Sequence, residues 1–291
     1  MTDFLQLTFS GLTTGAAYAL VALGFAIVFR GTRAINFAQG EYVMLAGVTA
    51  GALHQWAHPP LAVVVLAVVL MGALCGVATE VVCVRFTRRP DPNTITLATI
   101  GLGVAIKAVV LLATDRQAYT LPGFSGDATL HVGGAVLEAQ ALWNCALVAV
   151  AAGALAAFLR WAPLGVALRA SADDGEMAAA SGFSRNGAAA WSFALAGALA
   201  AAAGAGLAAV SPVNYDFGTL LGLKGFAAAM LGGLGSMPGA VAGGFAIGLT
   251  EAWFAGYVSS TYADVVAFGV LLIVLFTRPT GLFAAVRVER V

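Results

Sequence analysis

Three polar side chains, Asn36, Gln39 and Glu41, lie close together inside an apolar part of the chain. Two more ionisable residues, Lys224 and Glu251, lie within apolar stretches nearer the C-terminus. A charge at the centre of a lipid bilayer costs about 2.5–3.5 kcal/mol on insertion scales, so such groups face other helices, a partner chain or water. Their chemistry is therefore either the lining or gating of a polar route, or a buried ion pair such as Lys224 with Glu251 or with Glu41.

The stretch NFAQGE, residues 36–41, is compatible with two local structures. Gly40 permits a sharp change of backbone direction, and irregular backbone can enter a membrane where it faces protein or a water-filled cavity. In that case Asn36 and Gln39 brace or line the interior, because their amides need hydrogen-bond partners. In the alternative, Asn36 simply caps a helix that begins near Phe37. The pattern alone leaves both open.

Glu80 and Lys107 are also ionisable residues within apolar stretches, and we expect them to have structural roles. Glu80 lies near the end of its stretch, and Arg85 follows about one turn later. Lys107 has a long apolar stem that allows its ammonium group to reach a membrane interface.

Motifs for catalysis and for metal or nucleotide binding are missing from the sequence. It contains no Walker A motif, its three histidines are scattered, and its three cysteines fit no metal-site spacing. We therefore expect no enzymatic site and no cofactor bound by this chain.

The composition indicates an integral membrane protein. Of 291 residues, 60% are hydrophobic and 10% are charged, whereas a soluble domain carries about 25% charged residues. The formal net charge is zero and there is no basic run, so we expect no nucleic-acid partner. Many of the 36 glycines lie inside apolar stretches, where small residues let helices pack closely.

These stretches predict an all-α fold, a polytopic bundle of about eight or nine transmembrane helices that forms a single domain over residues 1–291. A transmembrane helix needs about 20 predominantly apolar residues. The candidate spans are residues 5–29, 41–57, 61–84, 94–113, 141–159, 190–210, 218–234, 239–258 and 262–277.

The distribution of positive charge predicts the orientation of the bundle. With the N-terminus outside and nine spans, 11 of the 14 Lys and Arg residues fall in inside segments, as the positive-inside rule requires. The C-terminus is then cytoplasmic. The longest outside segment is 114–140, where two alternating runs around Gly133-Gly134 predict a hairpin. The longest inside segment is 160–189.

The inside segment contains SADDGEMAAASG, residues 171–182, which predicts a short helix with acidic residues in its first turn and Gly182 as its stop. Its spacing of Glu176, Ala178 and Gly182 resembles the coupling loop of ABC-importer membrane subunits, E-A-A-x-x-x-G. Met177 replaces the first alanine, and the hydrophobic-Leu-Pro end of the common motif is missing. These departures argue against the maltose-type importers.

Four separate stretches together resemble the high-affinity branched-chain amino acid permease family, and in particular the shorter of its two membrane subunits. The resemblance covers nearly the whole chain and is weaker at the outer hairpin and the C-terminal tail. The four stretches are GLTTGAAYALVALGFAIVF at 11–29, NFAQGE at 36–41, LRASADDGEMAAASG at 168–182 and LKGFAAAMLGGLGSMPGAVAGGFAIGLTE at 223–251.

The resemblance implies a permease subunit of an ATP-driven ABC importer in the bacterial cytoplasmic membrane, with a helical bundle like that of the vitamin B12 and ribose importers. It implies four partners: a homologous second permease, two cytoplasmic ATPases that bind ATP and Mg²⁺, and a periplasmic substrate-binding protein. The default substrates are leucine, isoleucine and valine, although similar systems carry urea, amides or aromatic acids.

The resemblance also assigns roles to particular residues. Coupling to the ATPases would rest on Arg169, Asp173, Glu176, Ala178 and Gly182. The translocation pathway would involve Asn36, Gln39, Glu41, Lys224 and Glu251.

Two other readings of the sequence remain. An ion-coupled secondary transporter would also place ionisable groups and glycine-rich helices in the membrane, but it has no need of the E-x-A-x-x-x-G segment. A structural membrane subunit would support no solute flux.

Overall fold

The computed structural model describes residues 2–87, 91–132, 134–173, 185–278 and 280–283. Within these ranges each of the nine candidate spans is overlapped by a helix, which confirms the all-helical membrane fold. These helices are α1 (Thr2–Thr32), α2 (Gln39–Ala57), α3 (Leu61–Glu80) with its π-helical continuation η1 (Val81–Arg85), α4 (Pro92–Thr114), α5 (Ala139–Trp161), α8 (Arg185–Ala208), α9 (Phe217–Gly232), α10 (Met237–Tyr257) and α11 (Ala263–Thr277). A further helix, α6 (Pro163–Asp173), follows α5.

Five of the described helices are long and apolar enough to cross a membrane on their own: α1, α3 with η1, α4, α5 and α8. Helices α9 and α11 are apolar but shorter. Much of α3, α4 and α5 is exposed on the surface of the chain, whereas α1 and α8 are mostly buried. The bundle is therefore built around α1 and α8, with apolar helices turned outward as lipid requires.

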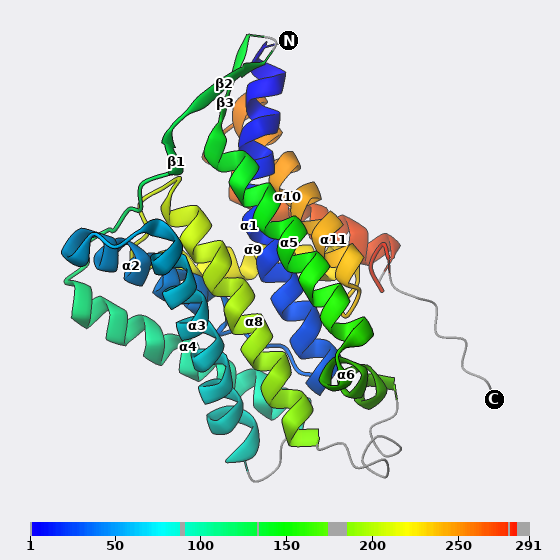
Figure 1. The fold of residues 1–291 in the computed structure, drawn as a ribbon. Coiled ribbons are helices and arrows are strands. Elements are labelled where there is room, and N and C mark those ends of the chain that lie inside the picture. Colours follow the sequence, from blue (N-terminus) through cyan, green and yellow to red (C-terminus); the bar gives the residue numbers. More distant parts are fainter. Residues whose placement is uncertain (1, 88–90, 133, 174–184, 279, 284–291) are drawn as a thin grey trace.

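Helix α1 packs along α10 (Figure 1), and small residues form the contact. A Cβ atom added to Gly11 would lie 2.9 Å from the Cα of Leu249, and one added to Gly15 would lie 3.1 Å from the Cα of Phe245. Gly244 and Gly248 of α10 face α1 just as closely. Glycine at these positions permits the close backbone approach that membrane helices use in place of a hydrophobic driving force.

The hairpin expected in the outside segment is confirmed. Strands β2 (Thr129–Val132) and β3 (Ala135–Glu138) pair antiparallel, and Val132 lies opposite Ala135. Strand β1 (Phe124–Asp127) precedes them. The hairpin lies beside the N-terminal end of α1, and α6 lies at the opposite end of the bundle (Figure 1).

Residues 33–38, between α1 and α2, form irregular backbone that is buried or partly buried in the bundle from Ala34 onward. Ala34, Asn36 and Ala38 are each at most 1% exposed. The side-chain oxygen of Asn36 accepts a hydrogen bond from the Ala38 N–H at 3.2 Å, and α2 begins at Gln39. Asn36 thus stabilises the turn before α2. The helix begins two residues later than the cap interpretation predicted. Of the two alternatives, the structure therefore shows the irregular backbone.

Two threonines of α4 accept backbone N–H groups of this segment. Thr96 Oγ1 accepts the Ile35 N–H at 3.2 Å, and Thr99 Oγ1 accepts the Phe37 N–H at 3.1 Å. Both threonines lie on one face of α4, because residues three apart are neighbours on a helix surface.

The start of α4 is fixed by Asp91. Its carboxylate accepts the Thr94 hydroxyl and the Thr94 N–H, the latter at 3.2 Å, and these hydrogen bonds hold the pKa of the Asp91 carboxyl below its usual value. Pro92 occupies the first helical position, where its missing N–H is not needed. This cap determines where Thr96 and Thr99 fall along the helix.

We expect Thr99→Val to lower the free energy of unfolding by about 1–3 kcal/mol, because it preserves side-chain shape but leaves the partly buried Phe37 N–H without its acceptor. Thermal unfolding in detergent measures the effect. Thr277→Val is the matched control, since the exposed Thr277 hydroxyl bonds only carbonyls of its own helix. Equal stability of the two variants would contradict the role given to Thr99.

Candidate functional site

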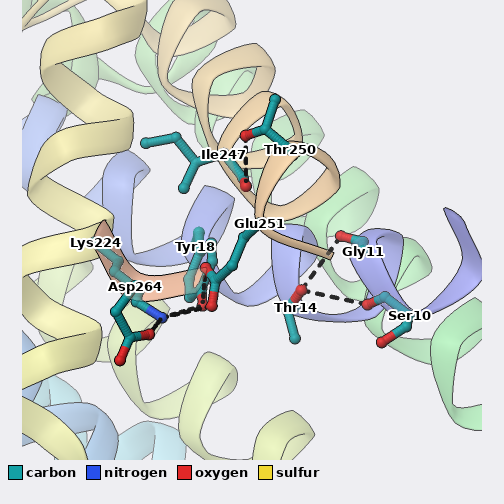
Figure 2. Close-up of polar contacts among 9 residues, drawn as sticks. All are labelled: Ser10, Gly11, Thr14, Tyr18, Lys224, Ile247, Thr250, Glu251 and Asp264. Carbon is teal, nitrogen blue, oxygen red and sulfur yellow. Dashed lines mark hydrogen bonds and ion pairs between the residues drawn. The ribbon is translucent and has the colours of Figure 1, made fainter. Parts of the chain in front are cut away.

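Lys224 of α9 is the centre of a cluster of polar groups from four helices (Figure 2). Its Nζ atom lies 2.6 Å from Glu251 Oε1 of α10 and 2.6 Å from Asp264 Oδ1 of α11. It also donates to the hydroxyl of Tyr18 of α1 at 3.3 Å, and Tyr18 donates to Glu251 Oε2 at 2.9 Å. The three protons of the ammonium group therefore have three acceptors.

The local sequence explains how α9 and α10 come together. The connection between them contains Gly233 and Gly235, with φ angles of 96° and 88°, a conformation that favours glycine. Ser236 then caps α10 by accepting the Gly239 N–H at 3.2 Å. This tight turn places the two helices side by side, so that Lys224 and Glu251 can meet.

Of the alternatives for Lys224, the structure shows the ion pair with Glu251, and Glu41 is not its partner. Asp264 is an addition that sequence reasoning missed. Its side chain is 51% exposed, whereas that of Lys224 is 6% exposed, so the cluster is a buried ion pair with a second carboxylate at its open edge. The signal available in the sequence was an acidic residue inside the expected span 262–277, at the start of α11 where the helix dipole favours a negative charge.

The cluster borders a cavity of about 380 Å³. Lys224 and Tyr18 line it together with Asn214 and Asp216, which precede α9. The cluster thus links helices through its ion pair, and two of its side chains also line a cavity.

Glu41 of α2 lies in a different place, on the opposite side of α9 from the cluster's partners α10 and α11. It is 6% exposed, and its Oε1 atom accepts the Thr219 hydroxyl at 2.8 Å. Its Oε2 atom has no hydrogen-bond partner among the described residues. Glu41 lines a cavity of about 550 Å³ between α2, α4 and α9, and Lys107 lines the same cavity.

Lys107 forms an ion pair with Asp216, the residue before α9, and lies 3.4 Å from the Thr219 hydroxyl. The structural role expected for Lys107 is thus an ion pair, and not the predicted extension of its ammonium group toward a membrane interface. The partner could not be inferred, because 109 positions separate the two residues. The expected pairing of Glu80 with Arg85 is confirmed at 3.3 Å.

Gln39 acts as a brace between helices. It is fully buried, and its Nε2 atom donates to the Ala196 carbonyl of α8 at 2.8 Å. Ala196 lies at the middle of the 24-residue helix α8. The amide fits there because Gly24 of α1 has no side chain, and a Cβ atom at Gly24 would overlap it. The start of α2 is therefore held near the centre of the bundle.

The residues expected to couple to ATPases are only partly described. Arg169 lies in α6, and Asp173 is the last residue of that helix. Glu176, Ala178 and Gly182 lie outside the described residues, as does most of the helix expected over 171–182. Helix α6 contacts α5, α1 and α8, and its Leu168 is fully buried, so the described part of the segment is anchored on the bundle.

A family model described as the permease component of branched-chain amino acid transport systems matches residues 7–275. The chain belongs to this family. It is 32% identical to the permease protein LivH of the high-affinity branched-chain amino acid transport system of Salmonella typhimurium, over 99% of this chain and 98% of that protein. The corresponding permease protein BraD of Pseudomonas aeruginosa is also 32% identical, with the same coverage.

The fold of this permease is similar to a solved structure of PsaBC from Streptococcus pneumoniae in complex with Fab. The TM-score is 0.50, and the match covers 95% of this chain and 92% of that one at 15% identity. That likeness concerns the fold alone. Family membership and the apolar helices together identify a multi-pass membrane permease.

We expect Lys224→Met to lower the free energy of unfolding by about 2–4 kcal/mol, because removal of the cation leaves the Glu251 carboxylate, whose side chain is only 17% exposed, without its counter-charge. Unfolding followed by tryptophan fluorescence in detergent measures the change. Lys107→Met is the matched control and should cost at most about 1 kcal/mol, since the Asp216 side chain is 67% exposed. An equal loss of unfolding free energy in the two variants would contradict the stronger effect expected at the more buried Lys224 ion pair.

Proposed function

We propose that this permease is one membrane-spanning subunit of an ATP-driven importer that moves branched-chain or related amino acids into the cell. The observation that carries the proposal is the end-to-end similarity to permeases of high-affinity branched-chain amino acid transport systems. The E-x-A-x-x-x-G spacing at Glu176, Ala178 and Gly182 supports the link to ATPases.

The proposed complex contains a homologous second permease, two cytoplasmic ATPases that bind ATP and Mg²⁺, and a periplasmic binding protein that delivers the substrate. Apolar residues on the outward faces of α3, α4 and α5 support a second permease and lipid as neighbours. Leu66, Leu74, Leu97, Leu112 and Val150 are each more than half exposed on this chain.

The proposed energy coupling runs through residues 160–189. ATP-driven closure of the ATPases would move this segment, and α6 supports transmission because it packs on the central helix α1 as well as on α5 and α8. The proposed orientation has the hairpin and the N-terminus outside and the C-terminus in the cytoplasm. The location of α6 and the hairpin at opposite ends of the bundle is consistent with it (Figure 1).

A pull-down of the tagged chain from its host in mild detergent, followed by mass spectrometry, tests the proposed assembly. We expect a second permease and two ATPases to co-purify. Recovery of the chain only as a homo-oligomer would contradict the importer and favour an ion-coupled transporter, which needs no ATPase.

We expect Glu176→Lys and Gly182→Asp to reduce leucine uptake at least tenfold while the chain stays at its normal level in the membrane. Uptake of radiolabelled leucine and quantitative immunoblotting measure the two quantities. Glu138→Lys is the control, because Glu138 is exposed in the hairpin at the other end of the molecule. Normal uptake by both coupling variants would refute the role of this segment.

A further inference from the structure

We propose that the cavity between α2, α4 and α9 is a binding site for a zwitterionic amino acid with an apolar side chain, held by Glu41 and Lys107. The inference rests on the proposed function and adds the place where the substrate is held within this chain. It starts from a buried carboxylate oxygen that has no donor in the part of the chain that the structure describes.

Glu41 has one carboxylate oxygen that lacks a hydrogen-bond donor among the described residues. Thr219 donates to Oε1, but Oε2 is buried and has no donor among the described residues. A buried acceptor without a partner costs about 1–3 kcal/mol, and more when it is charged. Because Glu41 lines the cavity, a ligand there with an ammonium group, which has N–H donors only, would supply the missing hydrogen bond.

Glycines keep the space around this carboxylate open. A Cβ atom on Gly218 would lie 2.8 Å from Glu41 Oε2, and one on Gly103 would lie 3.4 Å from Glu41 Cγ. Gly103 also lines the cavity. The first distance leaves no room for a side chain between α9 and the carboxylate. The second is an ordinary van der Waals contact, so Gly103 places α4 directly beside the Glu41 side chain in the cavity wall.

Lys107 supplies the opposite charge in the same cavity. Its described polar neighbours are Asp216 and the Thr219 hydroxyl, which leaves one of the three ammonium protons for a ligand carboxylate. The Asp216 side chain is mostly exposed, so water can solvate its carboxylate if Lys107 shifts from it toward a ligand. A zwitterion therefore meets one group of each sign.

The rest of the lining is apolar and fits an aliphatic side chain. The volume of about 550 Å³ is within the range of small-molecule sites. Val104 is 65% exposed on this chain, so the cavity opens at a surface that the proposed second permease would cover. The apolar lining residues are Phe37, Ile100, Val104 and Leu223.

The cavity beside Lys224 lacks this feature. The Lys224 ammonium already has Glu251, Asp264 and Tyr18 as acceptors, and both oxygens of Glu251 have donors. A ligand there would have to displace existing ion pairs, whereas a ligand at Glu41 completes an incomplete set.

Photo-crosslinking tests the site directly. The tagged chain is purified from its host in lipid nanodiscs with the proteins it retains and is labelled with photo-leucine, a diazirine analogue of leucine. Peptide mapping should place the label on the apolar lining. Leucine should compete at concentrations at least tenfold lower than 4-methylpentanoate, which lacks the ammonium group, or 3-methylbutylamine, which lacks the carboxylate.

Charge variants separate the two halves of the site. Glu41→Gln should remove the preference for leucine over 4-methylpentanoate, and Lys107→Gln should remove the preference over 3-methylbutylamine. Each preference is the ratio of the competing concentrations of leucine and one analogue, measured in the same sample. Partial misfolding lowers the total labelling but does not change this ratio. Unchanged preferences in both variants, or a label that maps to other helices, would overturn the proposal.

A steric pair of variants gives an independent check. Gly103→Leu should fill the cavity and reduce labelling at least tenfold, whereas Gly101→Leu, two residues away and with open space around it, should leave labelling and leucine uptake unchanged. Equal labelling in the two variants would overturn the site.

The test distinguishes failure of the site from failure of the proposed function. Leucine uptake that depends on this chain, combined with a label elsewhere, would refute the site alone. Labelling as expected in the cavity, combined with uptake that persists when the chain is deleted, would support the site and refute the importer.

Discussion

The constraint on which the rest of this structure depends is that polar backbone inside an apolar bundle must find its partners within the protein. Residues 33–38 are irregular, and from Ala34 onward they are buried or partly buried. The threonines of α4 together with Asn36 accept N–H groups of this segment. Gln39 then fixes the start of α2 on the middle of α8. Because the helix starts inside the bundle, Glu41 in its first turn is carried into the interior instead of remaining at a membrane surface.

The buried charges of this permease differ in how completely they are satisfied. Lys224 holds α1, α9, α10 and α11 together through a set of hydrogen bonds that uses all its donors. Among the described residues, Glu41 accepts a hydrogen bond from Thr219 at Oε1 and has no donor at Oε2. A charged group with all its hydrogen-bond partners stabilises the helix arrangement. A charged group that lacks a partner and lines a cavity is suited to reversible ligand binding. The polar groups around Lys224 and those around Glu41 lie on different sides of α9. This helix therefore contributes both to the stability of the bundle and to the proposed substrate site.

The sequence predicted the features that depend on short-range patterns. Each expected span corresponds to a helix because a long apolar run in lipid has few other options. The hairpin followed from the alternation around Gly133-Gly134, and Glu80 with Arg85 followed from their close spacing. For residues 33–38 the pattern gave two alternatives, and the choice between them depends on Thr96 and Thr99, about 60 residues downstream.

Partners far apart in the chain could not be predicted in the same way. Tyr18 and Glu251 are separated by 233 positions and Lys107 and Asp216 by 109, and only the packing of the helices brings them together. The carboxylate of Asp264 was missed because it lies at a span end, where an acid is usually solvated. The coupling residues Glu176, Ala178 and Gly182 lie outside the described residues, so their roles remain predictions from the motif.

Hydrogen–deuterium exchange of the assembled permease in lipid nanodiscs tests the central claim most directly. If residues 33–38 are internally hydrogen-bonded and hold α2 at the centre of the bundle, peptides covering 33–41 should exchange as slowly as those from the middle of α8. Exchange as fast as that of peptides from the β2–β3 hairpin would contradict the account, because it would mean that these backbone groups bond to water instead of to α4.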